Sequence, residues 1–137
     1  MVNPHIIRFI LAMLTMTSIQ AFAQQLIAGV WQGSFTNALG KRYEIYYSIE
    51  YSQNEQNQPS ITMINMDLEP TPDYTYLLTD ILLQENNLSF KIPRVHDTRI
   101  CNLTRQDDDS YSGQCQSDKA VEGETSLIIM LPPENEN

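Results

Sequence analysis

The stretch from Tyr43 to Tyr51 alternates between apolar or aromatic residues and polar residues along almost its whole length. One face carries Tyr43, Ile45, Tyr47, Ile49 and Tyr51, and the other carries Glu44, Ser48 and Glu50, with Tyr46 as the exception. Alternate side chains of a β-strand point to opposite faces, whereas a helix repeats about every 3.6 residues. The pattern therefore predicts a half-buried strand and excludes an amphipathic helix here.

Other short segments of strand-like composition are separated by polar, Pro-rich or Asp-rich breaks. They are residues 29–35, 60–68, 77–83, 88–92, 99–105, 110–116 and 126–131. No segment has the period of a helix of three turns. The sequence thus predicts an all-β chain of about eight sequential strands in an antiparallel meander. Closure into a small barrel would leave no exposed edges, and a two-sheet β-sandwich is the alternative.

The N-terminus has the features of a secretory signal peptide over residues 1–23. A compact apolar run, Phe9–Thr17, is followed by small residues on either side of Phe22, at Ala21 and Ala23. The run is shorter than the roughly 20 apolar residues that a membrane-spanning helix needs. We expect cleavage before Gln24 and export to the periplasm or the extracellular space. The remaining chain would form a single β-barrel-like domain over 24–133, with a disordered tail over 134–137.

Charge restricts the partners of this chain. Acidic residues outnumber basic ones 17 to 8, which gives a net charge of -9, and removal of residues 1–23 takes away one further basic residue, Arg8. Binding to nucleic acid depends on Lys and Arg, so the sequence argues against a nucleic-acid partner. No later stretch is apolar enough to span a membrane as a helix. We expect a monomer that contacts a small molecule or another envelope protein.

Cys101 and Cys115 are the only cysteines and lie at equal distances from Asp108. Asp107–Asp109 has the composition of a turn. Antiparallel pairing about this turn sets Cys101 opposite Cys115, and also Leu103 opposite Gly113. Opposed Cβ atoms lie about 4.5–5.5 Å apart, and a disulfide needs about 3.5–4.5 Å, which local twist can supply. We therefore predict a structural disulfide in an oxidising compartment. A redox pair is the alternative, and the CxxC spacing typical of it is absent.

The sequence offers little for catalysis, so we expect a protein that is not an enzyme. His96 is the only histidine after the signal segment, and it precedes Asp97. A His–Asp pair can orient an imidazole, but no nucleophile motif such as GxSxG accompanies it. With one histidine and both cysteines paired, a zinc site lacks ligands. The adjacent acids of Asp107–Asp109 do not have the alternating spacing of a calcium loop. We predict no metal and no cofactor.

Aromatic residues form the candidate ligand site. Tyr43, Tyr47 and Tyr51 make one stripe, and Trp31 and Phe35 share a face of the preceding segment. Aromatic walls with a few polar groups suit small apolar ligands. The sequence thus nominates Trp31, Tyr43, Tyr47 and Tyr51 as ligand-binding residues. An ordinary barrel core is the alternative.

Several motifs, taken in order, resemble the small secreted lipocalin-like β-barrel domains of bacteria, many of them uncharacterised. The motifs are Gly29–Gly33 (Gly-x-Trp-x-Gly), the strand Tyr43–Tyr51, Asn87–Phe90 (ending in Leu-x-Phe), Tyr111–Cys115 (Tyr-x-Gly-x-Cys), and Gly123 with Leu127–Leu131. The resemblance implies a lipocalin-like small barrel in which the Gly-x-Trp segment closes one end beneath a ligand cup. The chain departs from true lipocalins because it is shorter and lacks a recognisable C-terminal helix. The resemblance supplies no catalytic residues.

Two functions follow as hypotheses. The first is an exported β-barrel binding or accessory protein for a small apolar molecule or an envelope protein. The second is an envelope inhibitor or immunity-like protein that uses an acidic loop face, Asp107–Asp109 with Glu122–Glu124, against a basic target. An open cup favours the first, and a filled barrel with a flat acidic rim favours the second.

Overall fold

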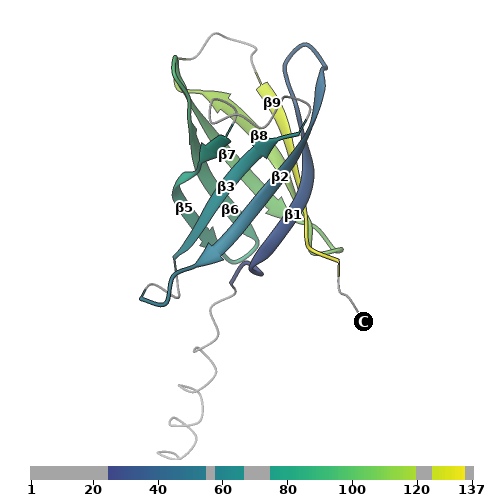
Figure 1. Ribbon diagram of the computed structural model, residues 1–137. Coiled ribbons are helices and arrows are strands. Elements are labelled where there is room, and N and C mark those ends of the chain that lie inside the picture. Colours follow the sequence, from purple (N-terminus) through teal and green to yellow (C-terminus); the bar gives the residue numbers. More distant parts are fainter. Residues whose placement is uncertain (1–24, 55–57, 67–74, 120–124, 135–137) are drawn as a thin grey trace, which may run out of the picture.

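A computed structural model describes residues 25–54, 58–66, 75–119 and 125–134. These residues form nine antiparallel strands and no helix (Figure 1). The strands are β1 (Gly29–Thr36), β2 (Arg42–Tyr51), β3 (Pro59–Asn65), β4 (Thr75–Leu77), β5 (Thr79–Gln84), β6 (Asn87–Pro93), β7 (Thr98–Arg105), β8 (Tyr111–Ser117) and β9 (Thr125–Leu131). None of the described segments is a helix long and apolar enough to cross a membrane. The signal segment predicted over 1–23 and most of the predicted tail lie outside the described residues.

The strands form one sheet in the order β4-β3-β2-β1-β9-β8-β7-β6-β5. Consecutive strands pair with each other except β4 and β5, which are the two ends of this order, and β1 also pairs with β9. The sheet curves round on itself into a nearly closed barrel (Figure 1). The predicted all-β meander is confirmed, and the barrel, rather than the two-sheet sandwich, is the architecture.

The two edges of the nearly closed barrel are connected by a segment that changes partners midway. The sequence predicts one strand over residues 77–83, but the structure interrupts it at Leu78, so nine strands replace the expected eight. Before the break, β4 pairs with β3, and after it β5 pairs with β6, at the other end of the strand order. The Leu78 amide donates to the carbonyl of Ile61 at 2.9 Å, and Asp80 adopts a positive φ of 51° next to a bulge. A bulge bends a strand sharply, which here carries the chain from one edge to the other.

The middle of the barrel is filled by side chains from most of the strands. The fully buried residues are Trp31, Tyr47, Ile49, Ile61, Leu88, Phe90, Ile92, Cys101, Leu103, Cys115, Ile128 and Met130. They occupy alternate positions, as the period-two pattern predicts. A barrel of about eight strands is just wide enough for such side chains to fill or to hold one small ligand. The core therefore leaves room for a ligand at the ends rather than along the whole axis.

Gly33 allows β1 to lie close against β9. A Cβ atom at Gly33 would lie 1.8 Å from the carbonyl oxygen of Ile129, far inside van der Waals contact. We expect Gly33→Ala to destabilise the barrel by about 1–3 kcal/mol or more, because backbone atoms must move to admit the methyl group. Thermal unfolding followed by circular dichroism measures this, with Gln32→Ala on the exposed face of the same strand as the control. Equal melting temperatures for Gly33→Ala and the parent would contradict the close approach.

The β7–β8 hairpin has the predicted register. Cys101 faces Cys115 and Leu103 faces Gly113. The two cysteines form a disulfide with their Cα atoms 4.1 Å apart, and both are fully buried inside the barrel. The predicted disulfide is confirmed, and a bond of this kind persists in a non-reducing compartment.

Candidate functional site

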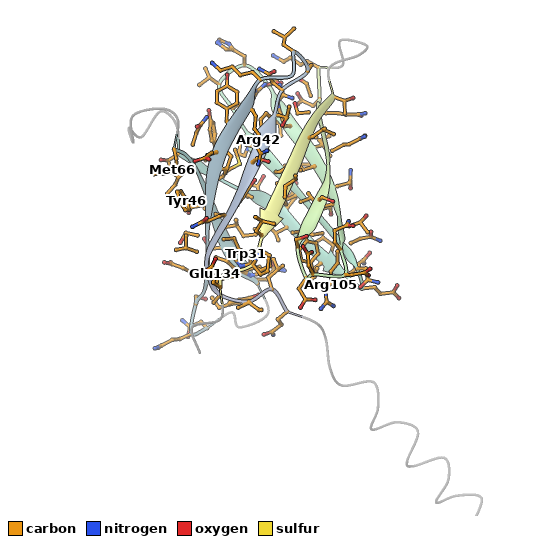
Figure 2. The ribbon with its side chains drawn as sticks, turned by 90° about the vertical axis from the view of Figure 1, so that its right-hand side faces the viewer. Trp31, Arg42, Tyr46, Met66, Arg105 and Glu134 are labelled. Atoms are coloured by element: carbon orange, nitrogen blue, oxygen red, sulfur yellow. A yellow bond between two sulfur atoms is a disulfide. The ribbon has the colours of Figure 1, made fainter. Side chains whose placement is uncertain are left out.

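The two ends of the barrel differ, and one of them is closed by the segment that precedes β1. Leu26 of this segment is buried, and its carbonyl accepts a hydrogen bond from the Tyr51 hydroxyl at 2.6 Å. The Trp31 indole N–H donates to the carbonyl of Ile27 at 2.8 Å, and the Trp31 and Tyr111 rings contact each other with centroids 6.1 Å apart. Figure 2 labels Trp31 at this end. A hollow of only about 150 Å³ remains there.

The opposite end, where β1, β3 and β6 finish, holds a larger cup of about 330 Å³. Apolar and aromatic side chains form most of its wall: Phe35, Tyr43, Ile45, Met63, Tyr76 and Ile92. The polar lining residues are Asn37, Asn65, Lys41, Arg94 and Arg99. A mostly apolar wall with a few polar groups is typical of a small-molecule site. This cup, defined by these eleven residues, is the candidate functional site.

Two of the cations in the cup lie over aromatic rings of its wall. The Lys41 ammonium is 5.0 Å from the centre of the Tyr43 ring, and the Arg99 guanidinium is 5.5 Å from that of Phe35. A cation over an aromatic face is held there by the ring's negative electrostatic potential. The two positive charges thus lie beside the apolar wall in defined positions.

Arg94 is held by a carboxylate of its own loop. It forms an ion pair with Asp97, and the Arg94 amide donates to the Asp97 carbonyl at 2.9 Å. The hydrogen bond from the Ser117 hydroxyl, together with Arg94, lowers the pKa of the Asp97 carboxyl below its ordinary value. Because Asp97 thus stays ionised, it orients Arg94 at the rim rather than acting as an acid.

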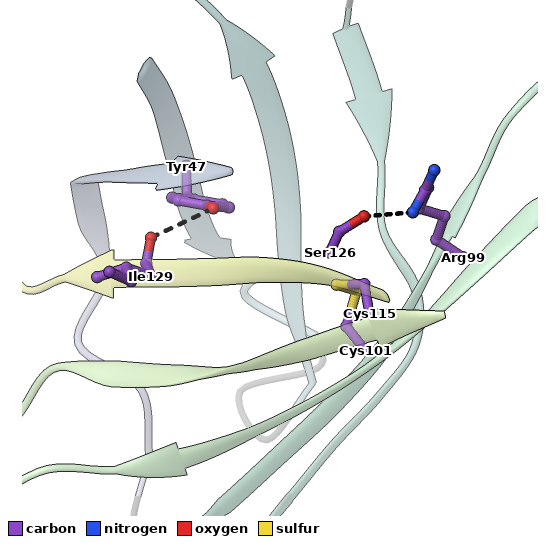
Figure 3. The surroundings of a disulfide bond; sticks show 6 residues. All are labelled: Tyr47, Arg99, Cys101, Cys115, Ser126 and Ile129. Atoms are coloured by element: carbon purple, nitrogen blue, oxygen red, sulfur yellow. Dashed lines mark hydrogen bonds between the residues drawn. A yellow bond between two sulfur atoms is a disulfide. The ribbon is translucent and has the colours of Figure 1, made fainter. Parts of the chain in front are cut away.

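The third cation, Arg99, occupies an inward position of β7, two residues before Cys101. Its guanidinium donates to the hydroxyl of Ser126, a fully buried residue of β9. Ser126 in turn faces Cys115 across the β8–β9 pair, so the disulfide lies beside this hydrogen bond (Figure 3). Arg99 is thus bonded to the residue of β9 that is paired with Cys115.

The four residues nominated from the sequence do not gather in one place. Tyr43 lines the cup. Tyr47 is fully buried in the middle of the barrel, where its hydroxyl is 3.4 Å from the Ile129 carbonyl that accepts its hydrogen bond (Figure 3). Tyr51 and Trp31 lie at the closed end. Burial raises the pKa of the Tyr47 hydroxyl far above its ordinary value, so it remains a neutral donor.

The remaining polar candidates do not form a catalytic or metal site among the described residues. The Asp107–Asp109 segment forms the predicted turn, in which Asp108 accepts hydrogen bonds from Ser110 and Asp109 pairs with Arg105. His96 is exposed in the loop after β6, and the carboxylate of Asp97 is engaged by Arg94 and Ser117. Within the described segments, no three His, Cys, Asp or Glu side chains are grouped as metal ligands.

The acidic face proposed from the sequence spans two loops that start from different ends of β8. The Asp107–Asp109 turn precedes Tyr111, at the closed end, whereas the loop that contains Glu122–Glu124 follows Ser117, at the end with the cup. Glu122–Glu124 lie outside the described residues. One of the three carboxylates in the turn, that of Asp109, already forms an ion pair with Arg105, which leaves less free charge for a basic partner.

Comparison of the chain with protein-family models, with curated proteins and with solved structures found no match.

Proposed function

We propose that this protein is an exported β-barrel binding protein that holds a small, largely apolar molecule in the cup at the open end of the barrel. The observation that carries the proposal is the cup itself. Its volume of about 330 Å³ lies at the lower end of the range of small-molecule sites, roughly 300–1,000 Å³. Its apolar wall would shield a ligand from water, and the hollow at the closed end is smaller, about 150 Å³.

The export predicted from the sequence would fit this role, because a binding protein outside the cytoplasm meets molecules that cross the envelope. The buried disulfide is consistent with that compartment.

We expect the exported form to begin at Gln24. Its intact mass should show the loss of residues 1–23, and retention of Met1 in exported protein would contradict the proposed cleavage.

Native mass spectrometry tests the binding function. We expect protein purified from the exported fraction, without organic solvent, to carry a small-molecule adduct that collisional activation removes. Asn65→Trp would place an indole in the cup and should abolish the adduct. Ile64→Trp, one residue earlier on the opposite face of β3, is the matched control and should retain it.

Three other results would count against the proposal. They are a bare protein in every preparation, an adduct that Asn65→Trp leaves unchanged, and an adduct with the mass of a protein. The last result would favour the alternative, an inhibitor or immunity-like protein that binds a partner in the envelope.

A further inference from the structure

One side of the barrel carries no charge on its outer surface, although the chain as a whole has a net charge of -9. The outward-facing side chains of four neighbouring strands, β1, β9, β8 and β7, are all uncharged. They are every second residue of 30–36, 127–131, 112–116 and 100–104, and we call this surface the neutral wall.

Charged residues border the neutral wall on both sides. The outward face of β2, which pairs with β1, carries Arg42, Glu44 and Glu50. On β6, which pairs with β7, Lys91 forms an ion pair with Asp80. Protein–protein interfaces have the same arrangement, because charge is depleted at their centre and polar groups form their rim.

An apolar ridge runs along the neutral wall. Leu127, Ile129 and Leu131 are successive outward residues of β9, and they are 51%, 37% and 45% exposed. Ile129 lies between Ser34 of β1 and Ser112 of β8, whose side chains are much shorter (Figure 2). Single exposed apolar residues are ordinary on a protein surface, whereas three in a row form a patch of the kind that marks interaction sites.

A hollow adjoins this ridge on the β7 and β8 part of the neutral wall. Its volume is about 490 Å³, and it is lined by Ile100, Asn102, Gly113, Gln114, Gln116 and Ser117. Gln114 is paired with Asn102 on one side and with Leu127 of the ridge on the other. The ridge and the hollow therefore lie side by side on one surface.

We propose that the neutral wall is an interface between two copies of this chain, related by a twofold axis, in which the ridge of each copy lies in the hollow of the other. In such a contact the same surface meets itself and must be complementary to itself. A ridge beside a hollow meets this requirement in shape. The amides of Asn102 and Gln114 meet it in hydrogen bonding, because an amide group both donates and accepts.

Charge favours a second copy over a partner of opposite charge. Two acidic copies repel each other where their charged surfaces meet, and the neutral wall lets them approach without placing like charges in contact. A basic partner would be attracted to carboxylates, and the described side chains of the neutral wall include none. A dimer of this kind does not depend on the ligand proposed for the cup, and it replaces the monomer expected from the sequence.

Sedimentation velocity of the exported protein over a range of concentrations tests this interface. We expect a dimer to form at about 10–100 µM, because interfaces at the small end of the size range bind weakly. Added salt should tighten the dimer, since it screens the repulsion between two acidic copies. A protein that stays monomeric at all these concentrations, with and without salt, would overturn the proposal.

Two substitutions place a carboxylate in the interface. Ile129→Glu alters the ridge, and Gln114→Glu alters the hollow with almost no change in shape. Each should weaken the dimer by about tenfold or more, because the twofold axis introduces the charge twice. The matched controls are Ile64→Glu on the outward face of β3 and Gln53→Glu at an exposed position after β2. Each control should change the dimer affinity by less than about twofold.

Circular dichroism establishes that each variant is folded, and if Ile129→Glu is not, Gln114→Glu decides the result. Dimers that all four variants weaken equally, or that none of them weakens, would overturn the placement of the interface on the neutral wall. A stable complex of one copy with a different protein, without any dimer of this chain, would overturn the second copy as the occupant.

Discussion

Trp31→Ala should lose about 3–5 kcal/mol of unfolding free energy, the typical cost of truncating a buried aromatic side chain. Trp31 is almost fully buried, faces Tyr47 across the β1–β2 pair, and contacts the Tyr111 ring. Its indole N–H also fixes the segment that closes the barrel through the Ile27 carbonyl. Because a domain of this size has roughly 5–15 kcal/mol of stability, the variant should be mostly unfolded or barely stable.

Urea unfolding followed by far-ultraviolet circular dichroism measures the loss, since Trp31 is the only tryptophan and its fluorescence disappears in the variant. Tyr46→Ala is the control, because Tyr46 is an aromatic residue on the outward face of β2 (Figure 2). Trp31→Phe should fall between the parent and Trp31→Ala, since it keeps a ring but loses the N–H donor. Equal stability of Trp31→Ala and Tyr46→Ala would contradict the role of Trp31 in the core.

Replacement of both Cys101 and Cys115 by Ser should be the other large effect. The disulfide closes a loop of about 15 residues, which is worth roughly 3 kcal/mol in the chain-entropy account. In a domain of this size, each kcal/mol corresponds to roughly 4–8 °C in melting temperature. Both side chains are also fully buried, so two serine hydroxyls would be enclosed in the barrel. We therefore expect a large drop in melting temperature.

A structural disulfide and a redox pair predict opposite results for this variant. If the bond is structural, ligand binding should persist at temperatures at which the variant stays folded, and reduction of the parent protein should lower its melting temperature as well. If the pair has a redox role, melting should change little and activity should be lost. Two free thiols in protein purified without reductant would contradict both the disulfide and the hairpin register.

The strands could largely be predicted because their signals are local. Alternation from Tyr43 to Tyr51 places Ile45, Tyr47 and Ile49 in the core, where the structure has them. The turn at Asp107–Asp109 fixes the register that joins Cys101 to Cys115. Closure of the barrel depends instead on the pairing of β1 with β9 and on the break at Leu78, and both involve residues distant in the sequence.

The site was harder to predict, because residues on the same face of a strand can lie at different positions along the barrel axis. Successive residues of a strand rise by about 3.3 Å, so the stripe from Tyr43 to Tyr51 runs the length of the barrel from the cup to the closed end. The sequence thus grouped residues that the fold separates. The sequence did contain a signal that Arg99 points into the barrel. Arg99 occupies the same face of β7 as Cys101 and Leu103, because the three residues alternate along the strand. Lys41 and Arg94 lie in loops, and only the fold brings them to the same mouth.

The location of the bound ligand is the central claim, and nuclear magnetic resonance tests it most directly. Amide resonances of the isotope-labelled protein are followed during a titration with decan-1-ol, a small and largely apolar molecule. Shifts should concentrate at Phe35, Tyr43 and Arg99, while the single indole N–H signal of Trp31, at the closed end, stays in place. Shifts centred on Trp31 and Tyr51, with Tyr43 unaffected, would contradict the assignment of the open mouth as the binding site.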